Sequence, residues 1–198
     1  MVSYLDLKNT ALAYLMLLET DETKMACVKQ YENSGNMTDA LASLHGILAS
    51  RFEAEKASML QKFYQRWQSE TLVINLWFAV QAMCPLPGTF EQVKGLMNHQ
   101  DFDIKNPNKV RALIGTFSNN AINFHQPDGT GYEFLTDQII LLDCLNPQIA
   151  SRLLGPLIKW RRYRSANGDL MRLQLERIMK EPDLSADVYE IVSKSLTI

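Results

Sequence analysis

The chain carries Asn106-Pro107-Asn108-Lys109-Val110-Arg111 and, forty residues later, Asn146-Pro147-Gln148-Ile149-Ala150-Ser151-Arg152. An Asn side chain accepts hydrogen bonds from the free N–H groups of a first helical turn. Pro fits the next position because its fixed φ is already helical and its missing N–H is not needed there. Each helix opening is followed one turn later by an arginine. The two openings therefore predict stacked helix pairs with Arg111 and Arg152 at comparable heights.

Apolar residues recur at helical spacing along most of the chain, as in the stripe Leu41, Leu44, Ile47 and Leu48. An earlier stripe contains Leu12, Leu15 and Met16. Further helices are expected at residues 52–67, 72–82, 90–98, 107–117, 132–145, 147–160, 170–180 and 185–196. Residues 84–88 break the pattern, because two prolines and a glycine cannot continue a helix.

Side-chain caps and turns separate these helices. Asn36 or Thr38 is expected to cap the helix that contains Leu41, and Thr89 the helix at 90–98. Residues 118–131 form a polar, turn-rich stretch. These breaks give ten to twelve helices, mostly short, with no convincing strand.

Connections of two to eight residues are typical of antiparallel helix pairs. We expect an all-α fold in which stacked antiparallel helix pairs form a solenoid-like superhelical domain of the HEAT/armadillo kind, although the internal sequence repeat is weak. Residues 1–198 are expected to form a single domain.

The composition is that of an ordinary globular protein: 46% of the 198 residues are hydrophobic, 21% are charged and the net charge is −2. This charge favours neither nucleic acid nor an anionic membrane as a partner.

Cys27, Cys84 and Cys144 lack metal-ligand or redox spacing, which indicates a reducing compartment. The start has no signal-peptide character, and its apolar run at 11–18 is short of the roughly 20 residues of a membrane span. We expect a cytoplasmic protein. Because the first residues already follow a helical pattern, the chain is expected to be part of a longer polypeptide.

Motifs that would carry catalysis are missing from the sequence. His45 is followed by Gly46, and His99 and His125 stand alone, so the chain has no H-E-x-x-H zinc pair. It also has no phosphate-binding loop and no G-x-S-x-G elbow. Residues 128–131, Asp-Gly-Thr-Gly, are better explained as a turn than as an anion cradle, and His125 has no nucleophile at a recognisable spacing. We expect no catalytic residue, metal or other cofactor in this chain.

A basic run with two aromatic residues occupies positions 159–164, Lys-Trp-Arg-Arg-Tyr-Arg. Arginines and aromatics together can bind single-stranded nucleic acid. Cations at the end of a helix also stabilise it by facing the negative end of its dipole. With a net charge of −2 and no second basic patch, the second interpretation is favoured and no nucleic-acid partner is expected.

Arg111, Gln148 and Arg152 are the candidate binding residues. Gln148 and Arg152 are four residues apart and share a helix face directed away from the buried stripe. That stripe is Ile149, Leu153 and Leu157. Spacing alone is typical of solvated surface residues. In a stacked-helix array, however, the concave surface is where such residues contact ligands.

Five segments in this order closely resemble the C-terminal helical domain of bacterial aminopeptidase N, the alanyl aminopeptidase of the zinc gluzincin class. The segments are residues 36–42, 77–82, 106–114, 124–132 and 146–153. The resemblance covers essentially the whole chain. Residues 164–168 depart from the family's usual sequence after Tyr163.

The resemblance implies a non-catalytic role in a larger enzyme. In the family, this domain packs on a catalytic domain of the same polypeptide, which holds zinc, and closes the cavity where peptides lose their N-terminal residues. Residues matching Arg111, Gln148 and Arg152 line that cavity, where guanidinium groups suit a peptide carboxylate or carbonyl.

Two other functions stay open from the sequence. A free-standing helical-repeat module that binds a protein partner would be favoured by an upstream reading frame that ends, with its own stop codon, directly before Met1. A nucleic-acid-binding helical repeat would depend on residues 159–164 alone.

Overall fold

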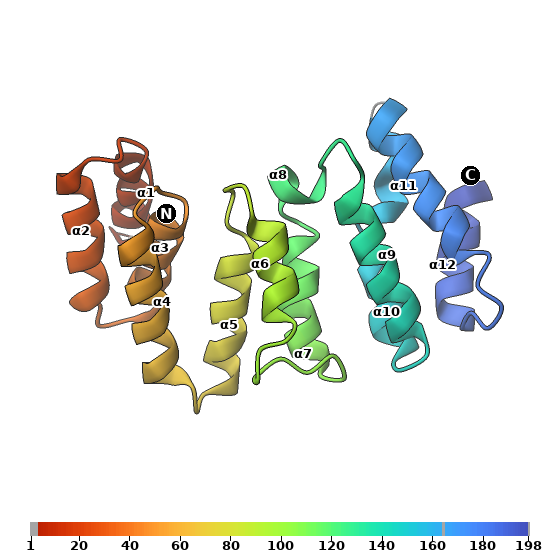
Figure 1. Cartoon of the computed structure of the whole chain (residues 1–198), viewed down its shortest axis with the longest axis horizontal. Helices are drawn as coiled ribbons and strands as arrows, with labels where there is room; N and C mark the ends of the chain where they lie inside the picture. The colour runs from red at the N-terminus through yellow and green to blue at the C-terminus, as the bar shows by residue number, and fades with distance from the viewer. Residues whose placement is uncertain (1–3, 164, 198) are drawn as a thin grey trace. The chain divides into compact units, whose positions relative to one another are not determined.

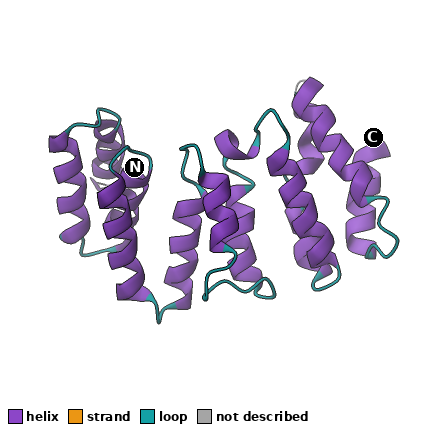
Figure 2. Ribbon diagram, in the orientation of Figure 1, coloured by secondary structure: helices purple, strands orange, loops and turns teal. Residues whose placement is uncertain are grey.

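The computed structural model describes residues 4–163 and 165–197, and in this part of the chain all regular structure is helical (Figures 1 and 2). The expected all-α fold is confirmed. The chain divides into two compact units, Met1–Leu86 and Pro87–Ile198, which we describe one at a time. The single domain expected over residues 1–198 stays a prediction.

Over its described residues, 4–86, the first unit has five helices that alternate in direction and are joined by short loops (Figure 1). They are α1 (Tyr4–Met16), α2 (Asp21–Glu32), α3 (Met37–Leu48), α4 (Glu53–Trp67) and α5 (Thr71–Ala82). Its core contains the fully buried side chains of Leu44, Ile47, Phe63 and Phe78. α3 lies at the centre, since it packs against α1, α2, α4 and α5.

Caps explain where two of these helices begin. The Asn36 side chain accepts from the N–H of Asp39, so Asn36, rather than Thr38, caps α3. α2 was not expected from apolar spacing, because only Thr23 and Cys27 are buried along it. It begins instead with a reciprocal capping box, in which Thr20 and Thr23 each bond the other's backbone N–H.

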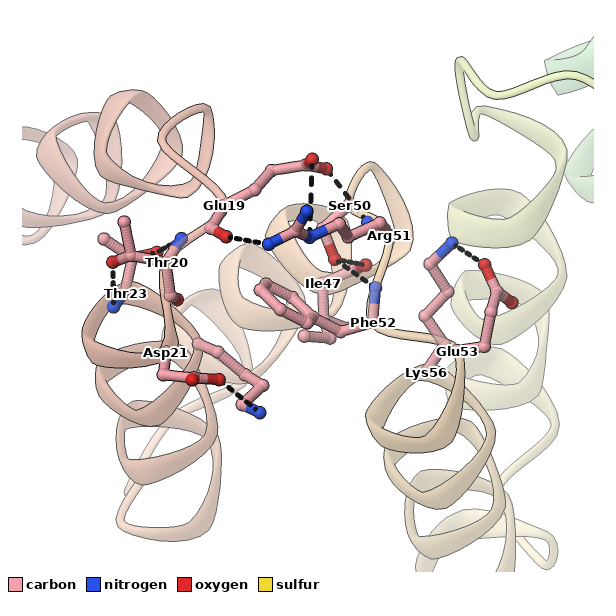
Figure 3. A network of polar contacts seen from close by, with 11 residues as sticks. Glu19, Thr20, Asp21, Thr23, Ile47, Ser50, Arg51, Phe52, Glu53 and Lys56 are labelled. Carbon is pink, nitrogen blue, oxygen red and sulfur yellow. Dashed lines mark hydrogen bonds and ion pairs between the residues drawn. The ribbon is translucent and has the colours of Figure 1, made fainter.

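The loop before α2 is tied to the loop before α4 (Figure 3). Glu19 has φ +48°, a conformation that residues other than glycine rarely adopt. Its carboxylate accepts from the Arg51 N–H at 2.9 Å, and its carbonyl accepts from Arg51 Nη2 at 3.1 Å. Arg51 thus holds Glu19 in the left-handed turn that ends the α1 segment.

A buried carboxylate joins α1 to α3. The Asp39 side chain, only 8% exposed, accepts from Lys8 Nζ at 2.5 Å, Asn9 Nδ2 at 3.0 Å and Asn36 Nδ2 at 3.0 Å. The hydrogen bond from Lys8 holds the pKa of Asp39 below its ordinary value, although burial opposes this shift. The charge of Asp39 therefore stabilises the contact between the two helices.

The second unit contains the remaining helices, which include one π-helical and one 3₁₀ segment. They are α6 (Thr89–Leu96), α7 (Pro107–Val110), η1 (Arg111–Gly115, π), α8 (Ala121–Phe124), α9 (Thr130–Asp143), α10 (Pro147–Leu153), η2 (Leu157–Arg162, 3₁₀), α11 (Ser165–Ile178) and α12 (Ala186–Thr197). Val110, Leu113, Ile114 and Phe117 recur at helical spacing and are fully buried. Phe117 is also the centre of an aromatic cluster, with ring centroids 5.5 Å from Phe90, 5.7 Å from Phe134 and 6.1 Å from Phe124.

Some boundaries differ from the expected ones. The predicted cap Thr89 is wrong: Thr89 is the first residue of α6, and Gly88, with φ +87°, precedes it without a side-chain cap. The helix expected at 147–160 ends at Leu153 and, after a turn at 154–156, is followed by η2. The turn-rich stretch contains α8, where the Asn120 side chain accepts from the N–H of Asn123. α11 begins at Ser165, earlier than the expected residue 170.

Two glycines allow backbone segments to approach closely. A Cβ on Gly131 would lie 2.3 Å from the Phe124 carbonyl oxygen. A Cβ on Gly168 would lie 2.8 Å from the Trp160 carbonyl oxygen, where α11 packs on η2. A side chain at either position would push backbone apart. The segment 164–168, expected to depart from the family's usual sequence, also includes Arg164, which lies outside the described residues.

Candidate functional site

The two Asn-Pro openings form as predicted. Asn106 Oδ1 accepts from the N–H of Asn108 at 3.0 Å and of Lys109 at 3.4 Å, and α7 starts at Pro107. Asn146 Oδ1 accepts from the N–H of Ile149 at 3.3 Å, and α10 starts at Pro147. Both helices therefore begin at fixed positions.

The first of these helices changes form at the candidate residue. From Arg111 to Gly115 the backbone is π-helical, so its hydrogen bonds span five residues instead of four. The Thr116 N–H donates to the Arg111 carbonyl, and the Thr116 hydroxyl donates to the same oxygen at 3.3 Å. Single π turns occur often at functional sites. Here the π turn places Thr116 one turn above Arg111.

Arg111 and Arg152 line the same pocket of the second unit, a cavity of about 290 Å³. The other lining residues come from the end of the π-helical segment, from the residues just after it and from α10. They are Gly115, Thr116, Ser118, Asn119, Ile149 and Leu153, with Pro156 added from the turn after α10. The structure thus brings together two of the three candidate residues, from helices with similar openings.

Gln148 lies one turn before Arg152 on α10, with an exposed side chain. Gln148 is not among the described residues that line the pocket. Arg111 and Arg152 are exposed as well, as the spacing predicted. A guanidinium group presents several N–H donors in a plane that matches a carboxylate, and it stays charged at all relevant pH values. Two such groups at one pocket suit an anionic or carbonyl-rich ligand.

Sequence reasoning did not find the remaining polar residues of the pocket. Ser118 Oγ and Asn119 Nδ2 both donate to the Gly115 carbonyl at 2.8 Å. These bonds satisfy a carbonyl at the end of the π-helical segment. No sequence signal marks them, because their position depends on the π turn.

His125 is held between two tyrosines. Its Nδ1 lies 2.7 Å from the Tyr132 hydroxyl, and its Nε2 lies 3.0 Å from the Tyr163 hydroxyl. Burial lowers the pKa of His125 and favours the neutral ring. Burial, with Tyr163 nearby, raises the pKa of Tyr132 to about 12. With both nitrogens engaged, His125 acts as a structural residue that joins α9 to the segment before α11.

The basic run makes a structural contact with a different helix from its own. Arg161 Nη1 donates at 2.6 Å to the carbonyl of Ser195, in the last turn of α12, and Trp160 Nε1 donates to the same oxygen at 3.4 Å. The Arg161 and Arg172 guanidinium carbons lie 4.2 and 5.6 Å from the Trp160 ring centroid. The Arg161 guanidinium therefore faces the negative, C-terminal end of a helix. The sequence analysis expected such a contact at the helix that carries the basic run, whereas the structure places it at α12.

Over residues 4–163 and 165–197, no group of three or more His, Cys, Asp or Glu side chains is arranged to hold a metal ion. Nor does this part contain a helix that combines the length and the apolar character needed to cross a bilayer.

The fold and the pocket define an all-helical repeat domain with an arginine-lined surface pocket. Residues 5–197 match the family described as "Domain of unknown function (DUF3458_C) ARM repeats", and the chain belongs to this family. Together with this family match, the relatives described next confirm the resemblance to the C-terminal helical domain of aminopeptidase N.

Aminopeptidase N of Caulobacter vibrioides is 48% identical over 163 residues, which are 81% of this chain and 19% of that protein. Aminopeptidase N of Escherichia coli is 39% identical over 191 residues, 96% of this chain and 22% of that protein. The solved structure of Legionella pneumophila aminopeptidase A in complex with aspartic acid matches with a TM-score of 0.90 at 33% identity, covering 97% of this chain and 23% of that one. This chain thus spans about a fifth of the length of these relatives.

Proposed function

We propose that this chain is the non-catalytic C-terminal helical domain of a zinc-dependent aminopeptidase N, and that it closes and lines the cavity in which peptides lose their N-terminal residues. The names of the relatives, and the small share of their length that the chain spans, support this proposal. The observation that carries it is the placement of Arg111 and Arg152 at one pocket.

The residues present do not fit a zinc site, since the chain lacks an H-E-x-x-H pair. The proposal therefore assigns zinc and catalysis to the part of the polypeptide outside this chain, on a catalytic domain that is its partner. The same proposal includes a cytoplasmic location and short peptides as substrates.

Within the cavity, Arg111 and Arg152 bind the part of the peptide that leaves after hydrolysis. Their guanidinium groups donate charge-assisted hydrogen bonds to its carboxylate or carbonyl oxygens. Gln148, exposed one turn from Arg152, is assigned to the wall of the cavity beside the pocket. The chain thereby contributes to peptide binding and orientation while the chemistry occurs elsewhere.

The test compares two substrates of the polypeptide encoded by the whole reading frame. Arg152→Ala should lower kcat/KM for a peptide with a free carboxylate by about tenfold or more, while an alanyl anilide, which lacks that carboxylate, changes little. Arg162→Ala is the matched control, because Arg162 is an exposed arginine of η2 outside the pocket lining. Equal losses on the two substrates would exclude the carboxylate role of Arg152.

A simpler measurement addresses the assignment of catalysis. The 198-residue chain should neither retain zinc after purification nor hydrolyse an alanyl anilide when zinc is added. Zinc-dependent turnover that survives repurification would mean that the chain carries its own site, and the proposal would fail.

A further inference from the structure

The first unit contains a pocket of its own, where the end of α2 and the start of α3 meet the end of α4. This cavity has a volume of about 190 Å³, and all of its lining residues lie between positions 31 and 67. Its apolar and aromatic lining residues are Tyr31, Met37, Ala40, Phe63 and Trp67. We call it the Trp67 pocket. Aromatic walls of this kind are typical of sites for small organic ligands.

The walls of the Trp67 pocket are held in place by the core of the unit. Phe63 is 1% exposed and Ala40 8%, so both side chains are anchored by packing. The Tyr31 hydroxyl donates to the Met59 carbonyl at 3.3 Å, which ties the end of α2 to α4. A pocket with fixed walls binds a ligand without the cost of ordering its own side chains.

The polar side chains of the loop at 33–36 are already hydrogen-bonded within the protein. The Ser34 hydroxyl donates to the Tyr31 carbonyl at 2.7 Å. The Asn36 side chain accepts from the Asp39 N–H at 2.8 Å and donates to the Asp39 carboxylate at 3.0 Å. These groups close the turn between α2 and α3, so they contribute little to the binding of a ligand.

Arg66 differs from these groups. Its guanidinium carbon lies 5.1 Å from the Trp67 ring centroid, so the cation rests on the ring. Over residues 4–163 and 165–197 no ion pair joins Arg66 to a carboxylate, whereas Lys62, one turn earlier on α4, lies 3.1 Å from Glu32. The charge of Arg66 acts on the pocket, because it opposes the rise that burial causes in the pKa of Tyr31. A stacked guanidinium keeps N–H groups at its edge that can donate to a ligand.

We propose that the Trp67 pocket binds a small aromatic carboxylate, with the ring against Phe63 and Trp67 and the carboxylate on Arg66. A cavity of about 150 Å³ holds benzene, so this pocket has room for one ring and a short acid arm. An anionic group matches the guanidinium of Arg66 through charge-assisted hydrogen bonds. The proposal goes beyond the function proposed above and does not depend on it, because Arg111 and Arg152 line a pocket of the second unit.

The test is a nuclear magnetic resonance titration of the ¹⁵N-labelled 198-residue chain with 3-phenylpropanoate. The three tryptophans give three indole N–H signals, and Trp67→Phe identifies the one that belongs to the pocket. We expect this signal to shift to saturation with a Kd on the order of 1 mM, as befits so small a ligand. Two related compounds, propanoate without the ring and 3-phenylpropanamide without the charge, should each bind at least about tenfold more weakly.

Variants on α4 separate the charge of Arg66 from a general effect of charge. Arg66→Gln should remove the preference for the acid over the amide, and its exposed position makes loss of the fold an unlikely cause, which circular dichroism checks. Lys62→Gln is the matched control, because it removes an exposed cation of the same helix outside the pocket lining. This control should keep the preference.

Three results would overturn the proposal. They are a Trp67 signal that does not move, equal binding of the acid and the amide, and a preference for the acid that persists in Arg66→Gln. A carboxylate bound only by Arg111 and Arg152 would give the first of these results. The titration is repeated with the polypeptide encoded by the whole reading frame, where loss of binding would mean that another part of the protein fills the pocket and would also overturn the proposal.

A last comparison distinguishes two sources of the same chemistry. Acetyl-Gly-Gly-Phe carries the ring and the carboxylate at the end of a peptide. Tighter binding of this peptide than of 3-phenylpropanoate would assign the Trp67 pocket to aromatic C-terminal residues of peptides, and weaker binding would assign it to a free aromatic acid.

Discussion

The carboxylate of Asp143, in the last turn of α9, binds both polar groups of Ser185, the residue before α12. Asp143 Oδ2 accepts from the Ser185 N–H at 2.8 Å, and Oδ1 accepts from its hydroxyl at 2.5 Å. The Ser185 hydroxyl oxygen in turn accepts from the N–H of Val188 at 3.2 Å. Asp143 is 6% exposed, so a buried carboxylate positions the start of a helix that lies 42 residues further along the chain.

Removing this carboxylate should destabilise the second unit. We expect Asp143→Ala to lower the free energy of unfolding by about 2 kcal/mol, because it leaves the partly buried N–H and hydroxyl of Ser185 without this acceptor. Ser185→Ala should cost about 1 kcal/mol, the usual value of a lost N-cap. Urea unfolding followed by circular dichroism measures both. Asp169→Ala, at an exposed position of α11, is the control and should change stability little. An Asp143→Ala variant as stable as the control would contradict the role of this contact.

Gly131 should not tolerate a methyl group. The added Cβ of Gly131→Ala would lie 2.3 Å from the Phe124 carbonyl oxygen, so backbone has to move. We expect a loss of at least about 2 kcal/mol. Gly95→Ala on α6 is the matched control, because its Cβ meets open space. It should raise stability by about 0.5–1 kcal/mol, since alanine favours a helix. Equal effects at the two glycines, measured by thermal unfolding, would refute the close approach.

Acid should weaken the first unit through Asp39. The pKa of Asp39 is held below its ordinary value of 3.8, first of all by the hydrogen bond from Lys8. A carboxyl group with a depressed folded-state pKa stabilises the fold above its unfolded pKa, and this contribution is lost as the pH falls through the folded pKa. We therefore expect the free energy of unfolding to decrease between about pH 5 and about pH 2.

Asp39→Asn supplies the comparison for that titration. The amide keeps the size of the side chain and has no charge to lose, so the variant should be less stable at neutral pH and less dependent on pH in the acid range. Parallel curves for the two proteins would show that Asp39 does not cause the acid dependence.

The three thiols should differ in reactivity. Cys27 is fully buried, and burial raises its pKa to about 11, so little thiolate forms at neutral pH. Cys84 is buried too, with its Sγ 3.2 Å from the Leu48 carbonyl oxygen, whereas Cys144 is exposed. Iodoacetamide should modify Cys144 first in the native protein, and all three in urea. Mass spectrometry of the digested protein identifies the site, and early modification of Cys27 would contradict its burial.

The sequence predicted those features that depend on local chemistry. The caps at Asn106 and Asn146, the buried stripe that includes Leu44 and Ile47, and the break after Ala82 all follow from side-chain type and spacing. Tertiary contacts decide the rest. α2 has little apolar periodicity and is held by a capping box and by packing on α3.

The candidate site divides in the same way. Arg111 and Arg152 could be singled out because they follow similar openings, and they line one pocket. Gln148 shares the helix face of Arg152 but does not line the pocket. The pocket covers only part of that helix face, so spacing alone could not decide which of the two residues lines it. Ser118 and Asn119 could not be found, because no sequence pattern marks a π turn.

Because of the π turn at Arg111–Gly115, the pocket wall depends on the number of residues in this turn as well as on their identity. Five residues complete this turn, so Thr116 follows Arg111 along the wall and Phe117 enters the core. A relative with one residue fewer between positions 110 and 117 could match both arginines and yet turn the following side chains by about 100°. A one-residue gap in an alignment at this point therefore signals a rebuilt pocket, even where Arg111 and Arg152 are present.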